Sequence, residues 1–312
     1  MIPRPGSLAN GEVARHRKLP AGRCDGSASG GALPGRGMTQ HAREQTWSHY
    51  LPQLPKAALR EAQGPSGQQQ VVGWSLCGVE FALELWPDVF QPTSTSECLA
   101  EALEVQPGEV VIDLGCGSGF FSILAAKRGA AKVYAVDIMP QAVALTRRNA
   151  KRNGVASRIE AFTGSLFEPL PGVRSDVIVD DVSGIAEDIA RATPWYPPSI
   201  PSGGPDGAEP TVTMLRQAPQ HLLPRGRLIF PVLSLANELR ILEAAQRFFA
   251  NLRLHTQQLF PIPQTLQEAL KSVKERLASG ALRLIPRGSR LCWQLRIFEA
   301  RMAAAPSQEN GP

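Results

Sequence analysis

The sequence has few aromatic residues and no long apolar run. Phe, Trp and Tyr make up 6% of the 312 residues, whereas the hydrophobic share of 43% is ordinary for a globular protein. No apolar stretch approaches the roughly 20 residues that a membrane helix needs. We therefore expect no membrane-spanning helix and no membrane partner. The length leaves room for one large or two small domains.

Cysteine is also scarce. The five cysteines are scattered, odd in number and form no C-x-x-C pair, which disfavours a disulfide framework and a zinc site. The pattern favours free thiols in a reducing compartment, so we expect a cytoplasmic location. The five histidines are equally dispersed, and we expect no metal centre.

The net charge of +5 is concentrated at the amino terminus. Residues 1–37 hold six Lys or Arg and two Asp or Glu, so the total charge does not predict nucleic-acid binding by the rest of the chain. Residues 271–301 hold eight bases and two acids. If these bases share a face, they form a docking surface for RNA or an acidic protein. The alternative is that they are solvated side chains.

Composition divides the chain into four parts. Residues 1–37 are rich in Gly, Pro, Ala and Arg and lack apolar periodicity, so we expect a disordered extension. Residues 38–70 read as a short helical segment and a polar linker. Residues 71–301 read as one folded domain, and residues 302–312 as a disordered tail.

The most informative segment is the apolar strand 110–114 followed by a loop with Gly115, Gly117 and Gly119. Glycine lets the backbone approach a ligand closely, because it has no Cβ and tolerates unusual φ/ψ. About 20 residues further on, a second apolar run ends at Asp137, whose carboxylate can accept hydrogen bonds from both hydroxyls of a ribose. The pattern predicts a nucleotide-like cofactor.

Strands and helices alternate around this loop. Strands are predicted over 110–114, 132–136, 158–163, 175–180, 227–233, 252–259 and 291–299, helices over 94–103, 119–128, 140–153, 210–222, 237–250 and 266–278, and a hairpin over 71–85. Such alternation predicts a doubly wound, mostly parallel sheet that binds its ligand at the carboxyl ends of the strands.

Two details disfavour a nicotinamide cofactor. The third glycine of the dinucleotide fingerprint would fall at Phe120. Asp113 adds a negative charge that repels a pyrophosphate but suits an ammonium or sulfonium group. The pattern D-x-G-x-G-x-G with a later acid resembles the S-adenosylmethionine (SAM) methyltransferases. That resemblance implies the seven-stranded, Rossmann-like class I methyltransferase fold, with SAM as cofactor.

Four blocks over residues 71–235 resemble the HemK-type, release-factor glutamine methyltransferases. They are Gly78–Phe81 with Val89–Glu97, the SAM loop with Asp137, Gly164–Leu170, and Gly203–Gly207 with Leu222–Leu228. The resemblance implies that Asp113, Gly115, Gly117, Gly119, Asp137, Ser165 and Leu166 bind SAM. It also implies a protein substrate.

The acceptor motif departs from that family. The family's N-P-P-Y aligns with Asp181, Val182, Ser183 and Gly184, so a carboxylate replaces the amide and the aromatic residue is lost. Asp180 and Asp181 are the candidate catalytic residues, because neighbouring carboxylates raise one another's pKa and one of them can act as a base. Each also has a structural interpretation, as a turn cap or a solvated side chain.

We therefore expect methyl transfer to an amine or hydroxyl group rather than to a glutamine amide. Trp195 and Tyr196 are candidates to replace the lost aromatic wall, with packing as the alternative. The remaining alternatives are an RNA methyltransferase, a small-molecule methyltransferase and a SAM-binding protein without catalysis. The sequence leaves the acceptor and the oligomeric state open.

Overall fold

The computed structural model of this chain describes residues 70–193, 196, 199–262, 266–267, 270–271 and 282–303. The expected extension over 1–37 lies outside these residues, as do nearly all of the segment 38–70 and most of the expected tail over 302–312. The expectations for those segments remain predictions.

The described part begins with the predicted hairpin. Strands β1 (Gln70–Leu76) and β2 (Val79–Leu85) pair antiparallel across a turn at Cys77 and Gly78, both of which have positive φ. Trp74 stacks on Phe81, and both rings contact Phe120 edge-on at centroid distances of 5.6 and 5.4 Å. The hairpin therefore packs against the first residue of α3 (Phe120–Lys127).

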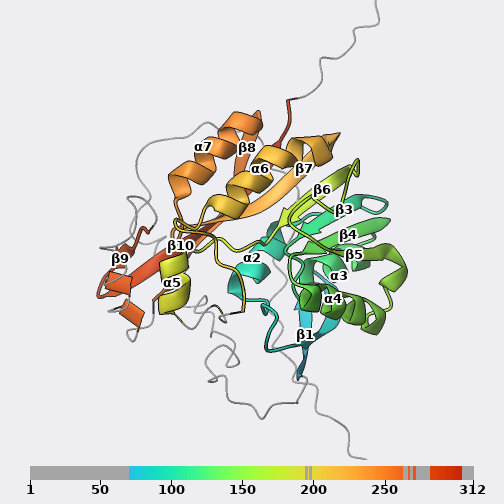
Figure 1. The fold of residues 1–312 in the computed structure, drawn as a ribbon, viewed down its shortest axis with the longest axis horizontal. Coiled ribbons are helices and arrows are strands. Elements are labelled where there is room, and N and C mark those ends of the chain that lie inside the picture. The colour runs from blue at the N-terminus through green and yellow to red at the C-terminus, as the bar shows by residue number, and fades with distance from the viewer. Residues whose placement is uncertain are drawn as a thin grey trace, which may run out of the picture. The chain divides into compact units, whose positions relative to one another are not determined.

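Helices and strands then alternate along the chain (Figure 1). The remaining elements are α2 (Ser94–Ala102), β3 (Val110–Leu114), β4 (Lys132–Asp137), α4 (Pro140–Arg152), η1 (Ala156–Arg158), β5 (Ile159–Thr163), β6 (Ser175–Asp180), α5 (Glu187–Ala192), α6 (Glu209–His221), β7 (Leu222–Leu233), α7 (Glu238–Phe248), β8 (Asn251–Pro261), β9 (Ile285–Arg287) and β10 (Arg290–Arg301). No helix among the described residues is long and apolar enough to cross a membrane.

Most predicted elements lie within one or two residues of their predicted bounds. The short elements η1, α5 and β9 were not predicted from the sequence. Strand β7 was predicted to begin at Arg227, but it begins at Leu222, which is buried and pairs with Ser175 of β6. Asn237 caps α7 as expected, because its side chain accepts a hydrogen bond from the N–H of Arg240. The predicted helix over 266–278 falls mainly outside the described residues.

The large sheet has the order β5-β4-β3-β6-β7-β10-β8, with β9 paired to β10. Strands β5, β4, β3, β6 and β7 run parallel, and β10 is antiparallel to both of its neighbours, β7 and β8. The chain begins the sheet at the central strand β3 and continues through β4 to the edge strand β5. It then returns to the other side of β3 with β6 and β7. The order therefore reverses beside β3, where such sheets bind ligands.

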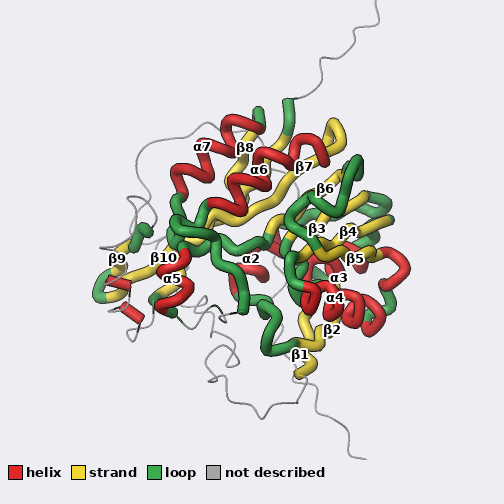
Figure 2. Tube along the Cα trace, viewed as in Figure 1, coloured by secondary structure: helices red, strands yellow, loops and turns green. Residues whose placement is uncertain are grey.

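Alternate strand residues point to opposite faces of the sheet and build two cores. Val111, Val133 and Val177 pack with α2 and α3, whereas Ile112, Ile178 and Phe230 pack with α6 and α7. Figure 2 shows α6 and α7 together beside β7, and α3 and α4 beside the strands at the other end of the sheet. The sheet is thus covered on both faces, as predicted.

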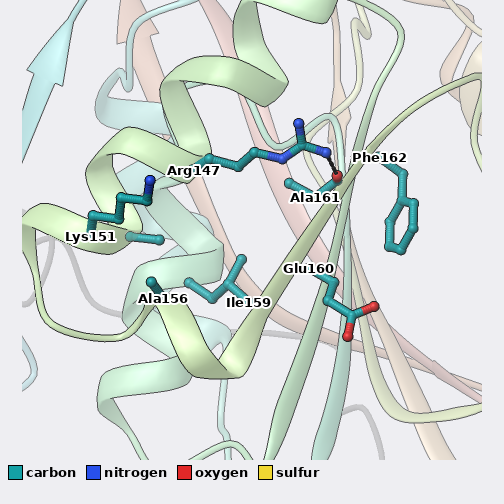
Figure 3. Close-up of a pocket in the computed structure, with 8 residues that line it drawn as sticks. Arg147, Lys151, Ala156, Ile159, Glu160, Ala161 and Phe162 are labelled. Atoms are coloured by element: carbon teal, nitrogen blue, oxygen red, sulfur yellow. Dashed lines mark hydrogen bonds between the residues drawn. The ribbon is translucent and has the colours of Figure 1, made fainter.

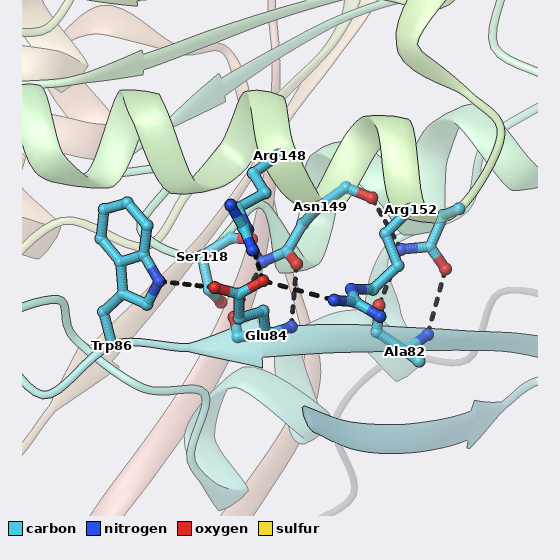
Figure 4. A network of polar contacts seen from close by, with 8 residues as sticks. Ala82, Glu84, Trp86, Ser118, Arg148, Asn149 and Arg152 are labelled. Carbon is cyan, nitrogen blue, oxygen red and sulfur yellow. Dashed lines mark hydrogen bonds and ion pairs between the residues drawn. The ribbon is translucent and has the colours of Figure 1, made fainter. Parts of the chain in front are cut away.

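A buried carboxylate ties β2 to α4 (Figure 4). Glu84 is fully buried, and its carboxylate accepts from Trp86 Nε1 at 2.9 Å, Arg148 Nε at 2.5 Å and Arg152 Nη2 at 3.3 Å. Burial raises the pKa of Glu84, but hydrogen bonds from Trp86, Arg148 and Arg152 outweigh it, so the net pKa lies below its ordinary value.

Two asparagines of α4 and its C-cap extend this junction. Asn149 Oδ1 accepts from the N–H of Glu84 at 2.8 Å, and its Nδ2 donates to the carbonyl of Glu84 at 2.9 Å. Asn153 makes the same pair of bonds to the backbone of Ala82, at 3.0 and 2.7 Å. The two amides therefore satisfy the outer backbone edge of β2, which has β1 on its other side.

Replacing Glu84 should weaken the fold. Glu84→Gln removes the charge that Arg148 and Arg152 contact, so we expect a loss of about 1.5–3 kcal/mol in urea unfolding at neutral pH. Because the folded-state pKa is lowered, this stability is present above the ordinary pKa of 4.5 and is lost as the pH falls through the lowered value. The difference between wild type and variant should shrink below about pH 4.5.

The matched control is Glu160→Gln, which breaks the pair with Lys132 at a half-exposed position. A pair of that kind contributes about 0–1 kcal/mol. Equal unfolding free energies for the two variants at neutral pH would show that the Glu84 junction does not support the fold.

Candidate cofactor and acceptor site

The glycine loop joins β3 to α3 in a backbone conformation that requires glycine. Gly115, Gly117 and Gly119 have φ values of 75°, 51° and 85°, in the left-handed region. The N–H groups of Gly115 and Cys116 both donate to the carbonyl of Val136 on β4. Cys116 itself is buried and its thiol pKa is raised by burial, so it packs in the loop and is not a nucleophile.

Asp137 lies at the carboxyl end of β4 and contacts this loop. Its Oδ2 accepts from the N–H of Gly117 at 2.9 Å, and its Oδ1 accepts from the N–H of Met139 at 2.9 Å. Burial raises the pKa of Asp137, while these two backbone donors lower it. The carboxylate is half-buried and oriented by the backbone, and each oxygen keeps a further lone pair for a ligand hydroxyl.

Two apolar side chains flank Asp137 at adjacent strand ends. Ile138 follows it and is 57% exposed, unusual for a residue of this size. Leu166 lies in the turn after β5, whose last residue Thr163 pairs with Asp137, and it has a left-handed φ of 50°. Such strain in a non-glycine residue costs about 1–3 kcal/mol and concentrates at functional sites. Ser165 beside it is exposed.

The family resemblance identified Ser165 and Leu166 as candidate site residues, but Ile138 was not predicted. The signal that could have identified Ile138 is its place as an apolar residue directly after the strand-terminal Asp137. Both apolar side chains can cover the faces of a planar base held beside the ribose-binding carboxylate.

Asp113 lies inside the fold rather than at an exposed loop entrance. It is fully buried on β3, and its Oδ2 accepts from Ser122 Oγ of α3 at 2.5 Å. Burial raises the pKa of Asp113 to about 7, against the hydrogen bonds from Ser122. Its Oδ1 is buried and has no hydrogen-bond partner among the described residues. The carboxyl of Asp113 is therefore enclosed by the fold, and its expected role in binding a cationic cofactor remains a prediction.

Asp180 and Asp181 end strand β6 beside β3. Asp180 is buried, and burial raises its pKa to about 7. Asp181 is half-buried, and its Oδ2 accepts from Ser96 Oγ of α2 at 3.1 Å. Burial raises the pKa of Asp181 well above its ordinary value, Ser96 lowers it, and the carboxyls of Asp180 and Asp113 raise it further.

The loop and Asp181 are in direct backbone contact. The N–H of Asp181 donates to the carbonyl of Leu114 at 3.0 Å. A Cβ on Gly115 would lie 2.9 Å from the carbonyl oxygen of Asp181, closer than real Cβ atoms approach. Gly115 therefore does more than permit a turn, because it lets the segment with the candidate base pack directly on the candidate cofactor loop.

The G-G-x-D-G block has a structural explanation. A Cβ on Gly207 would lie 2.6 Å from the N of Ala186, and Asp206 accepts from Arg240, from Asn237 and from the N–H of Ala208. The block thus fastens the segment after β6 to the start of α6 and to α7. The candidate site residues themselves come from β3, β4 and β6 and from the turns that follow these strands and β5.

Ion pairs offset part of the charge of the expected basic docking surface. Arg283 and Arg296 both pair with Glu238, and Arg301 pairs with Glu299. The side chains of Arg283 and Arg301 nevertheless stay 48% and 43% exposed. The described part of the chain also holds no group of His, Cys, Asp and Glu arranged to bind a metal ion.

A separate cavity of about 340 Å³ opens between α4 and β5 (Figure 3). Arg147 crosses it and donates to the carbonyl of Ala161 on the edge strand β5. Lys151, Ile159 and Glu160 also line it. None of its lining residues comes from the glycine loop, Asp137 or Asp181, so it is not part of the site.

Comparison with known proteins agrees with this geometry. The family model of ribosomal protein L11 methyltransferase (PrmA) matches residues 92–199. The chain is 37% identical over 182 residues to a release factor glutamine methyltransferase of Cereibacter sphaeroides, covering 56% of this chain and 64% of that protein. It is 39% identical over 115 residues to a ribosomal protein L11 methyltransferase of Pelotomaculum thermopropionicum, covering 36% of each.

The chain thus spans less than two thirds of the length of these relatives. A crystal structure of ribosomal protein L11 methylase from Lactobacillus delbrueckii covers 68% of this chain and 82% of its own, with 21% identity and a TM-score of 0.43. The fold assignment rests on this chain's own strand order rather than on that likeness.

The sheet order, with one antiparallel strand inserted next to the last parallel one, defines a Rossmann-like class I methyltransferase fold, as predicted. Over about half of its length the chain is similar to release factor glutamine methyltransferases at 36–37% identity, which agrees with the resemblance carried by the four sequence blocks.

The contact between Gly115 and Asp181 can be tested with a matched pair of substitutions. Gly115 and Gly172 have similar φ values of 75° and 72°, but nothing lies within 4 Å of a Cβ on Gly172. Gly172→Ala should cost about 1–2 kcal/mol from left-handed strain alone. Gly115→Ala should cost about 1–3 kcal/mol more, because its Cβ forces the backbone of Asp181 to move. Urea unfolding of both variants measures the difference, and equal losses would contradict the close contact.

Proposed function

We propose that this chain is a SAM-dependent methyltransferase that acts on a protein substrate. The observation that carries the proposal is the direct packing of two features. A glycine loop oriented by Asp137 meets a strand-terminal carboxyl pair, Asp180 and Asp181, across the contact at Gly115. The release factor and L11 methyltransferases to which the chain is similar support methyl transfer and a protein acceptor.

The residues present fit SAM. Asp137 can accept from the two ribose hydroxyls, and Ile138 and Leu166 can cover the base. Asp113 remains a candidate through the family resemblance, with its carboxyl enclosed behind the glycine loop. Ser165 remains a candidate partner for the adenine amino group. SAM, when bound, supplies a methyl group on a sulfonium that needs no further activation. The protein therefore has to align the acceptor and remove its proton.

Asp181 is the residue best placed for that second task. Its carboxyl is half-buried, held by Ser96 and adjacent to the cofactor loop. Its raised pKa makes the carboxylate a stronger base than an ordinary aspartate once deprotonated. An amide acceptor needs no such base before transfer, whereas an ammonium or hydroxyl group has a proton to lose. We therefore propose an amine or hydroxyl acceptor.

The scattered cysteines still favour a cytoplasmic location, and Cys77, Cys98, Cys116 and Cys292 all carry free thiols. The compartment does not affect the proposed reaction.

Asp137 should govern cofactor affinity. Calorimetry on the wild type should show binding of SAM and of its demethylated product but not of NAD. Asp137→Ala removes the acceptor for two hydroxyls and should weaken SAM binding by at least about 1.5–3 kcal/mol. The exposed Asp88 provides the control, since Asp88→Ala should bind SAM as the wild type does. Unchanged affinity in the Asp137 variant would refute the cofactor assignment.

Asp181 should govern turnover. We would incubate the protein with tritiated SAM and peptides that offer a lysine amine, a free amino terminus, a serine hydroxyl or a glutamine amide. On the best acceptor, Asp181→Asn should retain SAM binding and lower the rate by about 10²–10⁴-fold. The wild-type rate should rise with pH as Asp181 deprotonates, at higher pH than an ordinary aspartate titration, and the variant should lose this rise.

Two results would contradict that role. Efficient methylation of the glutamine peptide by the wild type would show that the replaced motif still serves an amide acceptor. An Asp181→Asn rate close to that of the wild type would show that the carboxylate is not the base. If the protein binds SAM but methylates none of the peptides, it is either a SAM-binding protein without catalysis or a methyltransferase with a different class of acceptor.

A further inference from the structure

Gly184 leaves an open position in the acceptor pocket. It stands where the related HemK-type enzymes have an aromatic residue, three residues after the candidate base Asp181. Its backbone is not in the left-handed region, and a Cβ there would make ordinary contacts with Leu233 Cδ1 at 3.6 Å and with the carbonyl oxygen of Val182 at 3.9 Å. The local backbone therefore does not require glycine at this position, and the space beside it is available to another side chain.

Tyr196 lies beside the replaced motif. Burial raises the pKa of its phenol, whereas the side chain of Ser183 and the backbone of Gly184, which lie next to the phenol, lower it. Ser183 Oγ itself donates to the carbonyl of Pro201 at 2.6 Å. Tyr196 has no atom within 4 Å of where a Cβ on Gly184 would be, so its ring stands beside that position without filling it.

The ring of Tyr196 extends toward the cofactor loop. It packs on Phe90 with a centroid distance of 5.3 Å and an interplanar angle of 42°. The carbonyl oxygen of Phe90 lies 3.4 Å from where a Cβ on Gly117 would be, so Phe90 stands beside the glycine loop. The rings of Phe90 and Tyr196 therefore form an aromatic pair between the glycine loop and the segment that follows β6.

Asp181 belongs to the same surroundings. Burial and the nearby carboxyl of Asp181 both raise the pKa of the Tyr196 phenol, which keeps it protonated and able to donate. Phe90, Asp181 and Tyr196 each keep part of their surface exposed. A carboxyl and two aromatic rings therefore lie close together near the surface of the fold.

We infer that Tyr196, with Phe90, forms an aromatic wall beside the candidate base Asp181, and is a specificity-determining residue for the acceptor. The inference rests on the proposed methyltransferase function. The wall contacts the apolar stem of the acceptor, whose terminal amine or hydroxyl then reaches Asp181. Aromatic packing and cation–π contacts of this kind contribute about 0.5–2 kcal/mol, or roughly 2- to 30-fold in affinity.

The test compares Tyr196→Ala, Tyr196→Phe and Tyr196→Leu with the control Tyr134→Ala. Tyr134 is also half-buried and also stacked, on Phe162 at 6.4 Å, but it lies on β4 away from Asp181. For each variant we would measure the melting temperature, SAM affinity and the KM and kcat for the peptide that the wild type methylates best. Calorimetry of the same peptide on protein loaded with the demethylated cofactor gives its affinity without turnover.

Tyr196→Ala and Tyr196→Leu should raise KM and weaken peptide binding by about 3- to 30-fold at unchanged SAM affinity, whereas Tyr196→Phe and Tyr134→Ala should stay near the wild type. If the alanine variant loses stability, the comparison rests on the leucine variant, which keeps an apolar side chain but not the ring. A wild-type KM in the leucine variant, or equal losses in the phenylalanine and alanine variants, would overturn the inference. A wild type that binds no SAM would instead refute the proposed function.

Discussion

The contact between Gly115 and the backbone of Asp181 is the constraint on which the rest of the site depends. No side chain fits between them, and the N–H of Asp181 is bonded to the residue before the loop. The position of the candidate base relative to the glycine loop is therefore fixed by direct backbone contact. Substitutions in the segment 181–184 can change what the Asp181 side chain contacts. They leave the backbone of Asp181 in place, because the contact with the glycine loop sets its position.

Helix α4 supports this arrangement from one face of the sheet. Thr146 Oγ1 donates to the carbonyl of Gly117 at 3.1 Å, and Asn149 Nδ2 donates to the carbonyl of Ser118 at 2.9 Å. The same Asn149 bonds the backbone of β2, and Arg148 pairs with Glu84 on that strand. The amino-terminal hairpin is consequently part of the frame that holds the cofactor loop, and its buried charge is satisfied by the helix that contacts the loop.

Local patterns predicted the frame well, whereas contacts between distant segments were harder to foresee. The loop, Asp137 and the alternating strands follow from glycine spacing and apolar runs that act over a few residues. The burial of Asp113 and the pairing of Arg283 and Arg296 with Glu238 depend on tertiary packing, which no local pattern encodes. Tyr196 illustrates the intermediate case. The sequence marked it as one of two aromatic candidates, but only its contacts with Phe90, Ser183 and Gly184 give it a position.

A crystal structure with the demethylated cofactor would test the central claim most directly, that Asp137 and Asp181 serve one cofactor from opposite sides of the glycine loop. The account predicts both ribose hydroxyls within hydrogen-bonding distance of the Asp137 carboxylate, the base between Ile138 and Leu166, and the thioether sulfur facing Asp181. A cofactor bound away from Asp137, or with its sulfur turned from Asp181, would contradict the account.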